Sequence, residues 1–355
     1  MARYDVTPDE LAELLAGEPA YRARQVWDGL YRLGTGPEEL TTLPRALRQR
    51  LAAEPALAPA LRADARVEAG DDTVKWRWEL ADGRRVETVL MHYPDRTTVC
   101  VSSQAGCAMG CSFCATGQAG FERNLTTGEI VEQVVRAGVE ARERGRRLSN
   151  VVFMGMGEPL ANYDRVWAAI ERLHADLGLS ARHLTVSTIG IVPGIRRLAR
   201  EELPVNLAVS LHAADDARRD ELVPVNRRYP LAELVEACRQ YVDAKGRRLS
   251  FEWALIDGVN DRPGDAARLA ELAREVRAHV NLIPLNPTPG YGVPGTPPAG
   301  VGAFRRLLVS LGVNATVRRN RGTDVDAACG QLAAGAQRGQ GRVRMLAGRR
   351  RAGPD

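Results

Sequence analysis

Lysine is almost absent from this chain, which has only Lys75 and Lys245 among its 355 residues, so arginine carries nearly all of the positive charge. Apolar stretches are short, and none approaches the roughly 20 residues that a membrane helix needs. The first residues, MARYDVTPDE, lack the apolar segment of a secretory signal. These absences predict a soluble, cytoplasmic protein with no membrane partner. Because thiols stay reduced in that compartment, clustered cysteines are expected to bind metal or to react rather than to form structural disulfides.

The composition suits an ordinary globular protein, with 45% hydrophobic and 26% charged residues over a length typical of one large domain plus a smaller one. The net charge of +5 is unevenly placed, because residues 318–355 contain nine arginines and three aspartates, a local charge of +6. The rest of the chain therefore carries −1. A basic segment can bind a phosphate backbone or can be a solvated tail, and charge alone leaves both interpretations open.

The first hundred residues predict two accessory parts. Residues 1–60 have the pattern of a small helical domain, with TPDE as a typical helix start. Residues 61–95 predict a β-hairpin linker, since TVKWRWEL and RRVETVLM flank the turn signal ADG. Strand alternation places Glu87 on the same face as Val89 and Met91. A carboxylate there is either an exposed edge residue or an acid–base group that points into a pocket.

Residues 96–317 alternate between apolar strands and amphipathic helices, which predicts an α/β fold with a parallel sheet covered by helices. The sheet is either curled, as a partial (β/α)6 barrel, or flat, as a doubly wound sheet. In both cases the functional residues belong at the carboxyl ends of the strands. The six expected strands lie in the segments TTVCVSSQ, NVVFMGMG, HLTVSTIG, VNLAVSLHA, RRLSFEWALI and HVNLIPLNP.

Three of the six cysteines lie in the segment CAMGCSFC, directly after the first of these strands. Structural zinc usually takes four ligands, often from two CxxC pairs, but no second pair and no nearby histidine accompany Cys107, Cys111 and Cys114. A 4Fe-4S cluster needs four iron ligands, so three thiolates would leave one iron open for a small molecule. The spacing therefore favours an iron–sulfur cluster, with zinc as the alternative.

The ends of the other strands carry residues that could hold such a small molecule. Glycine lets the backbone approach a ligand, and a carboxylate accepts hydrogen bonds from an ammonium group. Each of these residues also fits a turn or a helix cap, but four strand ends that converge favour a ligand site. The candidates are Gly157, Glu158, Ser187, Ser210, Leu211, His212 and Asn286.

The remaining cysteines have different surroundings. Cys238 lies on an amphipathic helix and is expected in the core, and on sequence alone the same applies to Cys100 in the first strand of the sheet. Cys329 lies in the small, polar segment RGTDVDAACGQL, where a mobile and reactive thiol is plausible.

Five segments together resemble the RlmN family of dual-specificity RNA adenine-C2 methyltransferases, within the radical S-adenosylmethionine (SAM) superfamily. They are TTVCVSSQAGCAMGCSFCATGQAGFERNL, VVFMGMGEPLANYD, LAVSLHA, NLIPLNP and RGTDVDAACGQL, and the resemblance spans nearly the whole chain. It implies a partial (β/α)6 radical SAM barrel whose three-cysteine loop holds a 4Fe-4S cluster, with SAM on the open iron. It also implies two SAM molecules per turnover and an electron donor such as flavodoxin or ferredoxin.

The resemblance implies methylation of C2 of adenosine in 23S rRNA and in tRNA next to the anticodon. Cys329 is then the methylated cysteine, Glu87 the proton acceptor, and Cys100 the thiol that resolves a covalent RNA–protein intermediate through a transient disulfide. Residues 1–60 become an expected RNA contact, and residues 318–355 become the segment that carries the methyl group. Both thiols must then meet over the cluster.

Three alternatives stay open. A C8-directed rRNA adenine methyltransferase shares these motifs, so motifs alone do not separate C2 from C8. A non-enzymatic RNA-binding protein with a structural metal would also explain the clustered cysteines and the basic C-terminal segment. A radical SAM enzyme that acts on a peptide or small molecule is a third reading, although simple hydrogen abstraction needs neither Cys100 nor Cys329.

Overall fold

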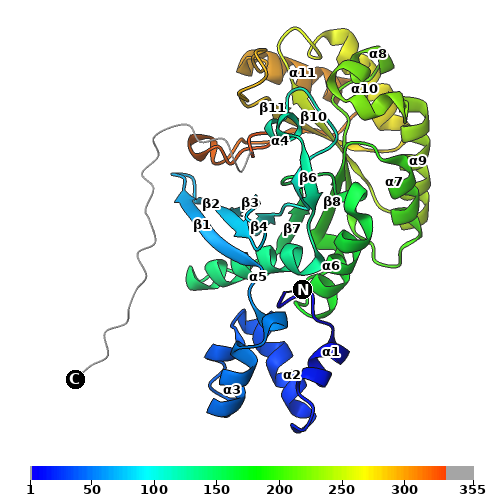
Figure 1. Ribbon diagram of the computed structural model, residues 1–355. Coiled ribbons are helices and arrows are strands. Elements are labelled where there is room, and N and C mark those ends of the chain that lie inside the picture. The colour runs from blue at the N-terminus through cyan, green and yellow to red at the C-terminus, as the bar shows by residue number, and fades with distance from the viewer. Residues whose placement is uncertain (1, 333–355) are drawn as a thin grey trace.

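The computed structural model describes residues 2–332, so residues 333–355 of the predicted basic segment lie outside the described residues. Helices at the N-terminus lie below a large curved sheet, and a group of antiparallel strands lies along one side of that sheet (Figure 1). The N-terminal helices are α1 (Pro8–Leu14), α2 (Tyr21–Asp28) and α3 (Arg45–Ala52), with short helical turns at Gly29–Leu33, Pro37–Glu39 and Pro55–Leu57.

The predicted helix start is confirmed. The Thr7 hydroxyl accepts a hydrogen bond from the Glu10 backbone, and the Glu10 carboxylate accepts one from the Thr7 backbone, which forms a capping box at α1. Polar contacts join this region to the barrel, since Trp27 of α2 donates to the Asp176 carboxylate at 3.0 Å. The N-terminal helices are therefore packed on the barrel and not merely tethered to it.

The described residues form one ten-stranded sheet in the order β1-β2-β3-β4-β7-β8-β9-β10-β11-β12. The first four strands pair antiparallel, and every pairing from β4 onward is parallel. The strands are β1 (Leu61–Glu68), β2 (Thr73–Leu80), β3 (Arg85–His92), β4 (Thr97–Cys100), β7 (Asn150–Phe153), β8 (Leu184–Thr188), β9 (Asn206–Ser210), β10 (Ser250–Leu255), β11 (His279–Pro284) and β12 (Ala315–Val317).

Helices cover the parallel part of the sheet, as the alternating pattern predicts (Figure 1). The long helices bury their apolar faces, and helix α5 buries twelve of its residues against the sheet and its neighbours. The helices are α4 (Ala115–Ala119), α5 (Thr127–Glu143), α6 (Tyr163–Ala175), α7 (Val192–Arg200), α8 (Asp216–Leu222), α9 (Leu231–Lys245), α10 (Pro263–Glu275) and α11 (Pro298–Ser310), with single turns at Pro159–Asn162, Ala181–His183, Pro224–Arg227 and Thr323–Val325.

All six expected parallel strands are present, and the sequence missed four further strands. The predicted hairpin is a three-stranded meander, because β1 pairs with β2. The three-residue β12 adds a seventh parallel strand beside β11. A separate two-stranded sheet, β5 (Gln104–Gly106) and β6 (Phe121–Asn124), brackets the three-cysteine loop. Cys238 is fully buried on α9, as expected. No helix within residues 2–332 has the length and apolarity to cross a bilayer.

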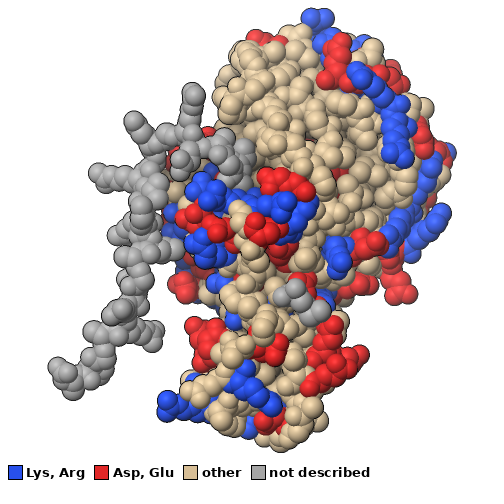
Figure 2. Space-filling view, viewed as in Figure 1, with Lys and Arg blue, Asp and Glu red and all other residues tan. Residues whose placement is uncertain are grey.

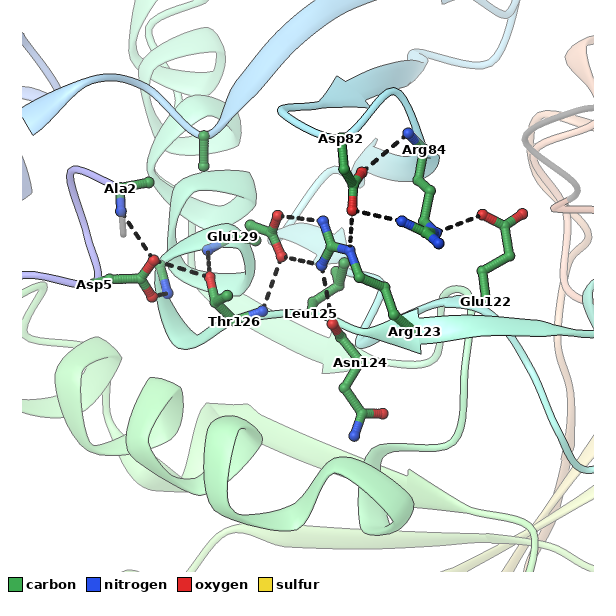
Figure 3. A network of polar contacts seen from close by, with 12 residues as sticks. Ala2, Asp5, Asp82, Arg84, Glu122, Arg123, Asn124, Leu125, Thr126 and Glu129 are labelled. Carbon is green, nitrogen blue, oxygen red and sulfur yellow. Dashed lines mark hydrogen bonds and ion pairs between the residues drawn. The ribbon is translucent and has the colours of Figure 1, made fainter. Parts of the chain in front are cut away.

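A network of ion pairs fastens the tip of the hairpin to the barrel (Figure 3). Arg123 of β6 donates to Asp82 in the hairpin turn and to both carboxylate oxygens of Glu129 in the first turn of α5. Arg84 extends the network by pairing with Asp82 and with Glu122. These contacts fix the hairpin that carries Glu87 against the barrel.

Candidate active site

The three candidate cluster ligands lie on one short loop between β5 and α4. Cys114 occupies the N-cap position of α4, and its backbone N–H donates to the Cys111 carbonyl at 3.3 Å. The Cys107 N–H donates to the Gly120 carbonyl at 2.8 Å and closes the loop at its other end. Gly106 has φ of 71°, and a Cβ there would lie 2.0 Å from the Gly120 oxygen, so this closure requires glycine. The loop is a compact turn that carries three thiols.

Burial makes the thiols of Cys107 and Cys111 weaker acids than a free cysteine. It raises the pKa of Cys107 to about 12 and also raises the pKa of Cys111, and Glu158 and the neighbouring thiols add to both effects. A metal that binds here therefore displaces protons, as it does wherever thiolates are ligands. No three His, Cys, Asp or Glu side chains within residues 2–332 converge as ligands of a single ion would.

A buried cation supports the fit of an iron–sulfur cluster to this loop. Arg219 is fully buried, and its guanidinium donates to the carbonyls of Ile189 and Leu211 and to the Asn226 side chain. Within the described residues it has no carboxylate partner at ion-pair distance, and its charge acts on the Cys111 thiol. A buried charge is costly, and a negatively charged cluster on the three cysteines would add to the through-space effect of Asp216 and Asp220 on Arg219.

The end of β7 is shaped around Gly157 and Glu158. Gly157 has φ of 95°, and a Cβ there would lie 2.5 Å from the Gln104 side chain. The buried Glu158 carboxylate accepts hydrogen bonds from the backbone N–H groups of Leu160 and Ile189, at 3.1 and 2.9 Å. Burial raises the pKa of Glu158 to about 7, although these hydrogen bonds oppose the rise. The carboxylate therefore ties the ends of β7 and β8 together.

The ends of β8 and β9 hold the next group of candidates. Ser187 lies near the end of β8 and is buried, and Ser210 ends β9 and is half-buried. Leu211 is buried directly after β9, and His212 follows it with φ of 60°, which is unusual for a residue other than glycine. His212 Nδ1 accepts the backbone N–H of Ala254, and burial lowers the pKa of His212 to about 3. The imidazole is neutral, with its proton on Nε2.

Two contacts join the strand ends to the reactive loops. The Phe113 ring packs edge-on against His212, with 4.8 Å between the ring centroids. Asn286, after β11, donates from Nδ2 to the Cys329 carbonyl at 3.0 Å and accepts from the Asn320 amide at 2.6 Å. Asn286, predicted as a SAM contact, therefore also holds the loop that carries Cys329.

Cys100, Cys114 and Cys329 line the same cavity of about 120 Å³. Cys100 ends β4, and burial raises its pKa to about 12, with a further rise from Cys329 and an opposing effect of Arg318. Cys329 comes from the segment after β12 and is exposed. All six cysteines lie within the described residues and all are free thiols, so the structure has no disulfide between Cys100 and Cys329.

Backbone contacts hold the Cys329 segment against the cluster loop. Ala115, directly after Cys114, donates its N–H to the Gly330 carbonyl at 2.9 Å. The Thr116 hydroxyl donates to the Leu332 carbonyl at 2.6 Å. The structure therefore brings the far end of the chain to the three-cysteine loop, as the sequence-based expectation requires.

Glu87 lies on β3, and its side chain is only 7% exposed, so the exposed-edge interpretation is wrong. It shares a face with Val89, which lines the cavity, and Cys100 is the direct partner of Val89 on β4. Glu87 itself is not among the residues that line the cavity, and it lies two residues before Val89 on β3. Its carboxylate pairs with Lys75 of β2 at 3.4 Å.

Residues 101–270 match the model of the radical SAM superfamily. The "probable dual-specificity RNA methyltransferase RlmN" of Chloroflexus aurantiacus is 53% identical over 348 residues, which cover 93% of this chain and 92% of the relative. The "dual-specificity RNA methyltransferase RlmN" of Anaeromyxobacter dehalogenans is 51% identical over 361 residues, which cover 97% of this chain and 96% of the relative. The chain belongs to the RlmN family.

A solved structure supports the fold at the same level. The crystal structure of a radical SAM methyltransferase from Sphaerobacter thermophilus has a TM-score of 0.91 and 52% identity, and the match covers 94% of this chain and 99% of that one. This RlmN-family chain is therefore a SAM-dependent radical methyltransferase with a partial radical SAM barrel. The family implies SAM and a 4Fe-4S cluster, which the three thiols and the buried cation beside them fit.

Sequence reasoning missed three charged residues in this RlmN-family site. Arg219 reads as an ordinary surface residue of a short amphipathic helix, yet it is buried beneath the cluster loop. Arg318 lines the cavity and pairs with the buried Glu252 at 3.2 Å. Lys75 pairs with Glu87. The one signal in the sequence that could have pointed to Lys75 is that lysine is so rare in this arginine-rich chain.

Proposed function

We propose that this protein methylates C2 of adenosine in 23S rRNA and in tRNA next to the anticodon, through a methylated cysteine and a covalent RNA–protein intermediate. The names of its relatives, which are dual-specificity RNA methyltransferases, support the RNA substrate. The observation that carries the mechanism is the shared cavity of Cys100, Cys114 and Cys329. It lies beside the three-cysteine loop, with Glu87 on the neighbouring strand.

The target atom explains why such a site is needed. C2 of adenine lies between two ring nitrogens and is poor in electrons, so it does not displace a methyl group from SAM as a nucleophilic nitrogen can. A route through a carbon radical avoids that demand. Cys107, Cys111 and Cys114 would hold the cluster, whose chemistry there would be the one-electron reductive cleavage of SAM. The strand-end candidates from Gly157 to Asn286 would hold SAM beside it.

Cys329 carries the methyl group. Its thiolate takes a methyl group from a first SAM by displacement and releases S-adenosylhomocysteine. The sulfur-bound methyl group would then give one hydrogen atom to the deoxyadenosyl radical from a second SAM, which becomes 5′-deoxyadenosine, and the remaining sulfur-bound methylene radical would bond to C2. Each turnover therefore uses two SAM molecules, and the RNA is now covalently attached to Cys329.

Glu87 and Cys100 release the product. Glu87 accepts the C2 proton, and the surplus electron of the adduct passes to a one-electron acceptor. The Cys100 thiolate attacks the Cys329 sulfur, the carbon–sulfur bond breaks, and a proton completes the new methyl group. The disulfide left between the two cysteines takes two electrons and two protons from a reductant, so it is a transient species. Flavodoxin or ferredoxin is the proposed electron donor.

The RNA must present the base outside its stack, at an unstacking cost of a few kcal/mol. Arginine–phosphate contacts would supply much of the affinity. On the face in Figure 2, basic and acidic side chains are intermixed over the hairpin and the N-terminal helices, and no broad basic patch appears on its described residues. Six of the nine arginines in residues 318–355 lie beyond residue 332. We therefore assign RNA contacts to the cavity mouth, to the C-terminal segment and to residues 1–60.

One experiment tests this function against its alternatives. Anaerobically reconstituted protein is incubated with SAM, a reductant, and fragments of 23S rRNA and tRNA, and the modified nucleoside is identified by mass spectrometry and NMR. We expect 2-methyladenosine. Methylation at C8 would establish the C8-directed alternative, and a zinc-containing protein without iron that does not cleave SAM would establish the non-enzymatic one. Cleavage of SAM without RNA methylation would indicate a peptide or small-molecule substrate.

A further inference from the structure

Lys75 is one of two lysines in the chain, and it forms an ion pair with the candidate proton acceptor Glu87. On the sheet, Lys75 of β2, Val89 of β3 and Cys100 of β4 are direct cross-strand partners. Side chains of paired residues in an antiparallel sheet point to the same face, so Lys75 points to the cavity face. Its side chain is 13% exposed.

The Lys75 ammonium group contacts two functional elements at once. It pairs with the Glu87 carboxylate at 3.4 Å, and it donates a hydrogen bond to the Asp326 carbonyl at 3.1 Å. Asp326 lies three residues before Cys329 and has φ of 52°, a left-handed conformation in which its carbonyl turns toward the hairpin. A lysine has three donors on one compact charge, which suits it to join a carboxylate and a carbonyl.

Other contacts attach the same segment to the turn between β1 and β2. Asp71 accepts hydrogen bonds from the Arg321 guanidinium and from the Gly322 N–H, and the Gly70 N–H donates to the Asp324 carboxylate. These contacts hold the beginning of the segment. Among these contacts between the hairpin and the segment, the one made by Lys75 is closest in sequence to Cys329. Lys75 is also the residue among them that pairs with Glu87.

Arg77 provides an internal comparison. It is the direct cross-strand partner of Glu87, two residues after Lys75 on the same face. Its guanidinium nevertheless bonds to Asp64 of β1, and its ion pair is with that residue. A cation next to Glu87 on the sheet is therefore not enough to join the carboxylate to the Cys329 segment, and Lys75 alone of these two makes that connection.

We propose that Lys75 is a positioning residue that couples the proton acceptor Glu87 to the seating of the Cys329 loop. The ammonium group orients the carboxylate through their ion pair, and it does so from the same position that fixes the loop three residues before the methyl-carrying sulfur. The base is thus in place when the thiol loop is in place. The role of Glu87 in this inference rests on the proposed function. The seating of the Cys329 loop by Lys75, which is the structural half of the inference, does not.

The structural half is tested without RNA or SAM. Amide hydrogen exchange is followed by mass spectrometry in peptides that cover residues 322–332, where the Ala327 and Gln331 N–H groups are hydrogen-bonded within the loop. In Lys75→Gln these amides should exchange several-fold faster than in the wild type. Arg77→Gln should match the wild type. Unchanged exchange in Lys75→Gln would overturn the coupling, and Lys75→Met serves as a second variant if Lys75→Gln does not fold.

The chemical half is tested in single turnovers. Methyl capture by Cys329, counted as label on the protein, should fall less in Lys75→Gln than the later step does, because capture loses only the seating of the loop, whereas the later step also loses the orientation of Glu87. Conversion of the RNA adduct to product should slow by roughly tenfold to 100-fold, since a general base that is displaced loses most of its effect. Lys75→Arg, which keeps the charge, should recover part of this loss.

The outcomes separate the two proposals. If the wild type forms no methylated RNA, the proposed function fails, while the exchange experiment still reports on Lys75. If the wild type methylates RNA and Lys75→Gln converts the adduct at the wild-type rate, the coupling fails alone. An equal loss in Lys75→Gln and Arg77→Gln would also overturn it, because it would reflect general damage to the hairpin.

Discussion

The Ala115 N–H donates a 2.9 Å hydrogen bond to the Gly330 carbonyl, which joins the residue after Cys114 to the residue after Cys329. Main-chain atoms therefore hold the loops of Cys114 and Cys329 side by side. Substitution of either cysteine side chain leaves this main-chain hydrogen bond in place. Asn286 adds a second hold on the Cys329 carbonyl. Variants of the individual cysteines should therefore remove chemistry while they leave the loop in position, which makes the steps of the proposed reaction separable.

The cluster loop gives the first prediction. Replacing Cys107, Cys111 or Cys114 by alanine should abolish iron loading, because two protein ligands do not hold a cluster whose open iron already depends on a small molecule. Iron and sulfide analysis and the visible absorbance of anaerobically reconstituted protein measure this. Cys238→Ala is the matched control, since Cys238 is a buried cysteine of α9 and not part of the loop, so the variant should leave the iron content unchanged. Full iron loading in a Cys111→Ala variant would contradict the assignment.

Cys100 and Cys329 should fail at different steps. Cys329→Ala should keep its iron but capture no methyl group, because no other thiol has the same access. Cys100→Ala should capture the methyl group and then remain covalently bound to RNA, since no thiolate is present to break the carbon–sulfur bond. Denaturing gel electrophoresis with labelled RNA detects the adduct. Multiple turnovers by Cys100→Ala would refute the resolving role.

The release step should depend on pH because of Cys100. Burial raises the pKa of this thiol to about 12, so at neutral pH only a small fraction is thiolate. Below that pKa the thiolate fraction grows about tenfold per pH unit, and decay of the RNA adduct should accelerate by up to about that factor between pH 7 and pH 8. A rate that stays flat over this range, measured by quenched single turnovers, would show that Cys100 deprotonation does not limit release.

Arg318 should set the size of this effect. Its charge lowers the pKa of Cys100, so Arg318→Met should raise that pKa and slow release at a given pH. Arg318→Met alone would leave the buried Glu252 carboxylate without its ion-pair partner. The variant to test therefore combines Arg318→Met with Glu252→Gln, which removes both charges of the pair. Slower release in the double variant, with normal methyl capture, is the expected result. Unchanged release would show that the charge of Arg318 does not act on the thiol.

Sequence patterns anticipated the parts of the fold that follow from local chemistry. The six parallel strands are short apolar runs between amphipathic helices, and the cysteine spacing needs no tertiary information. The strand β1 escaped notice because its exposed and half-buried residues lack a clear alternation. The three-residue β12 is too short for any periodicity and forms because β11 offers it a neighbour.

The sequence did not predict those contacts of the candidate site that depend on how neighbouring strands and loops align. The position of Glu87 on its strand was predictable, but its pairing with Lys75 follows from how β2 and β3 align. Arg219 is buried because carbonyl oxygens from two strand ends accept its donors, and nothing near it in sequence indicates those partners. Asn286 was expected to face a ligand, and its contact with Cys329 required knowledge of where the C-terminal segment lies.

Arg319 provides a test of RNA binding at the cavity mouth. Arg318, Arg319 and Arg321 all line the cavity, but Arg318 is paired with Glu252, and Arg321 with Asp71. Arg319 is exposed and has no hydrogen bond or ion pair to any residue between 2 and 332. An arginine in this state at the entrance to the thiols is suited to contact a phosphate of the extruded nucleotide.

The expected result is a change in salt dependence. Arg319→Ala should weaken binding of the RNA substrates and reduce the slope of log K against log salt by about 0.7 to 0.9, as the loss of one phosphate contact does. Iron content and methyl capture by Cys329 should not change. Arg306, an exposed arginine on α11, supplies the control Arg306→Ala, which should keep the wild-type slope. The slopes are measured by filter binding between 50 and 300 mM salt. Equal slopes in all three proteins would place the phosphate contacts elsewhere, because a protein that makes one phosphate contact fewer releases fewer counterions when it binds RNA.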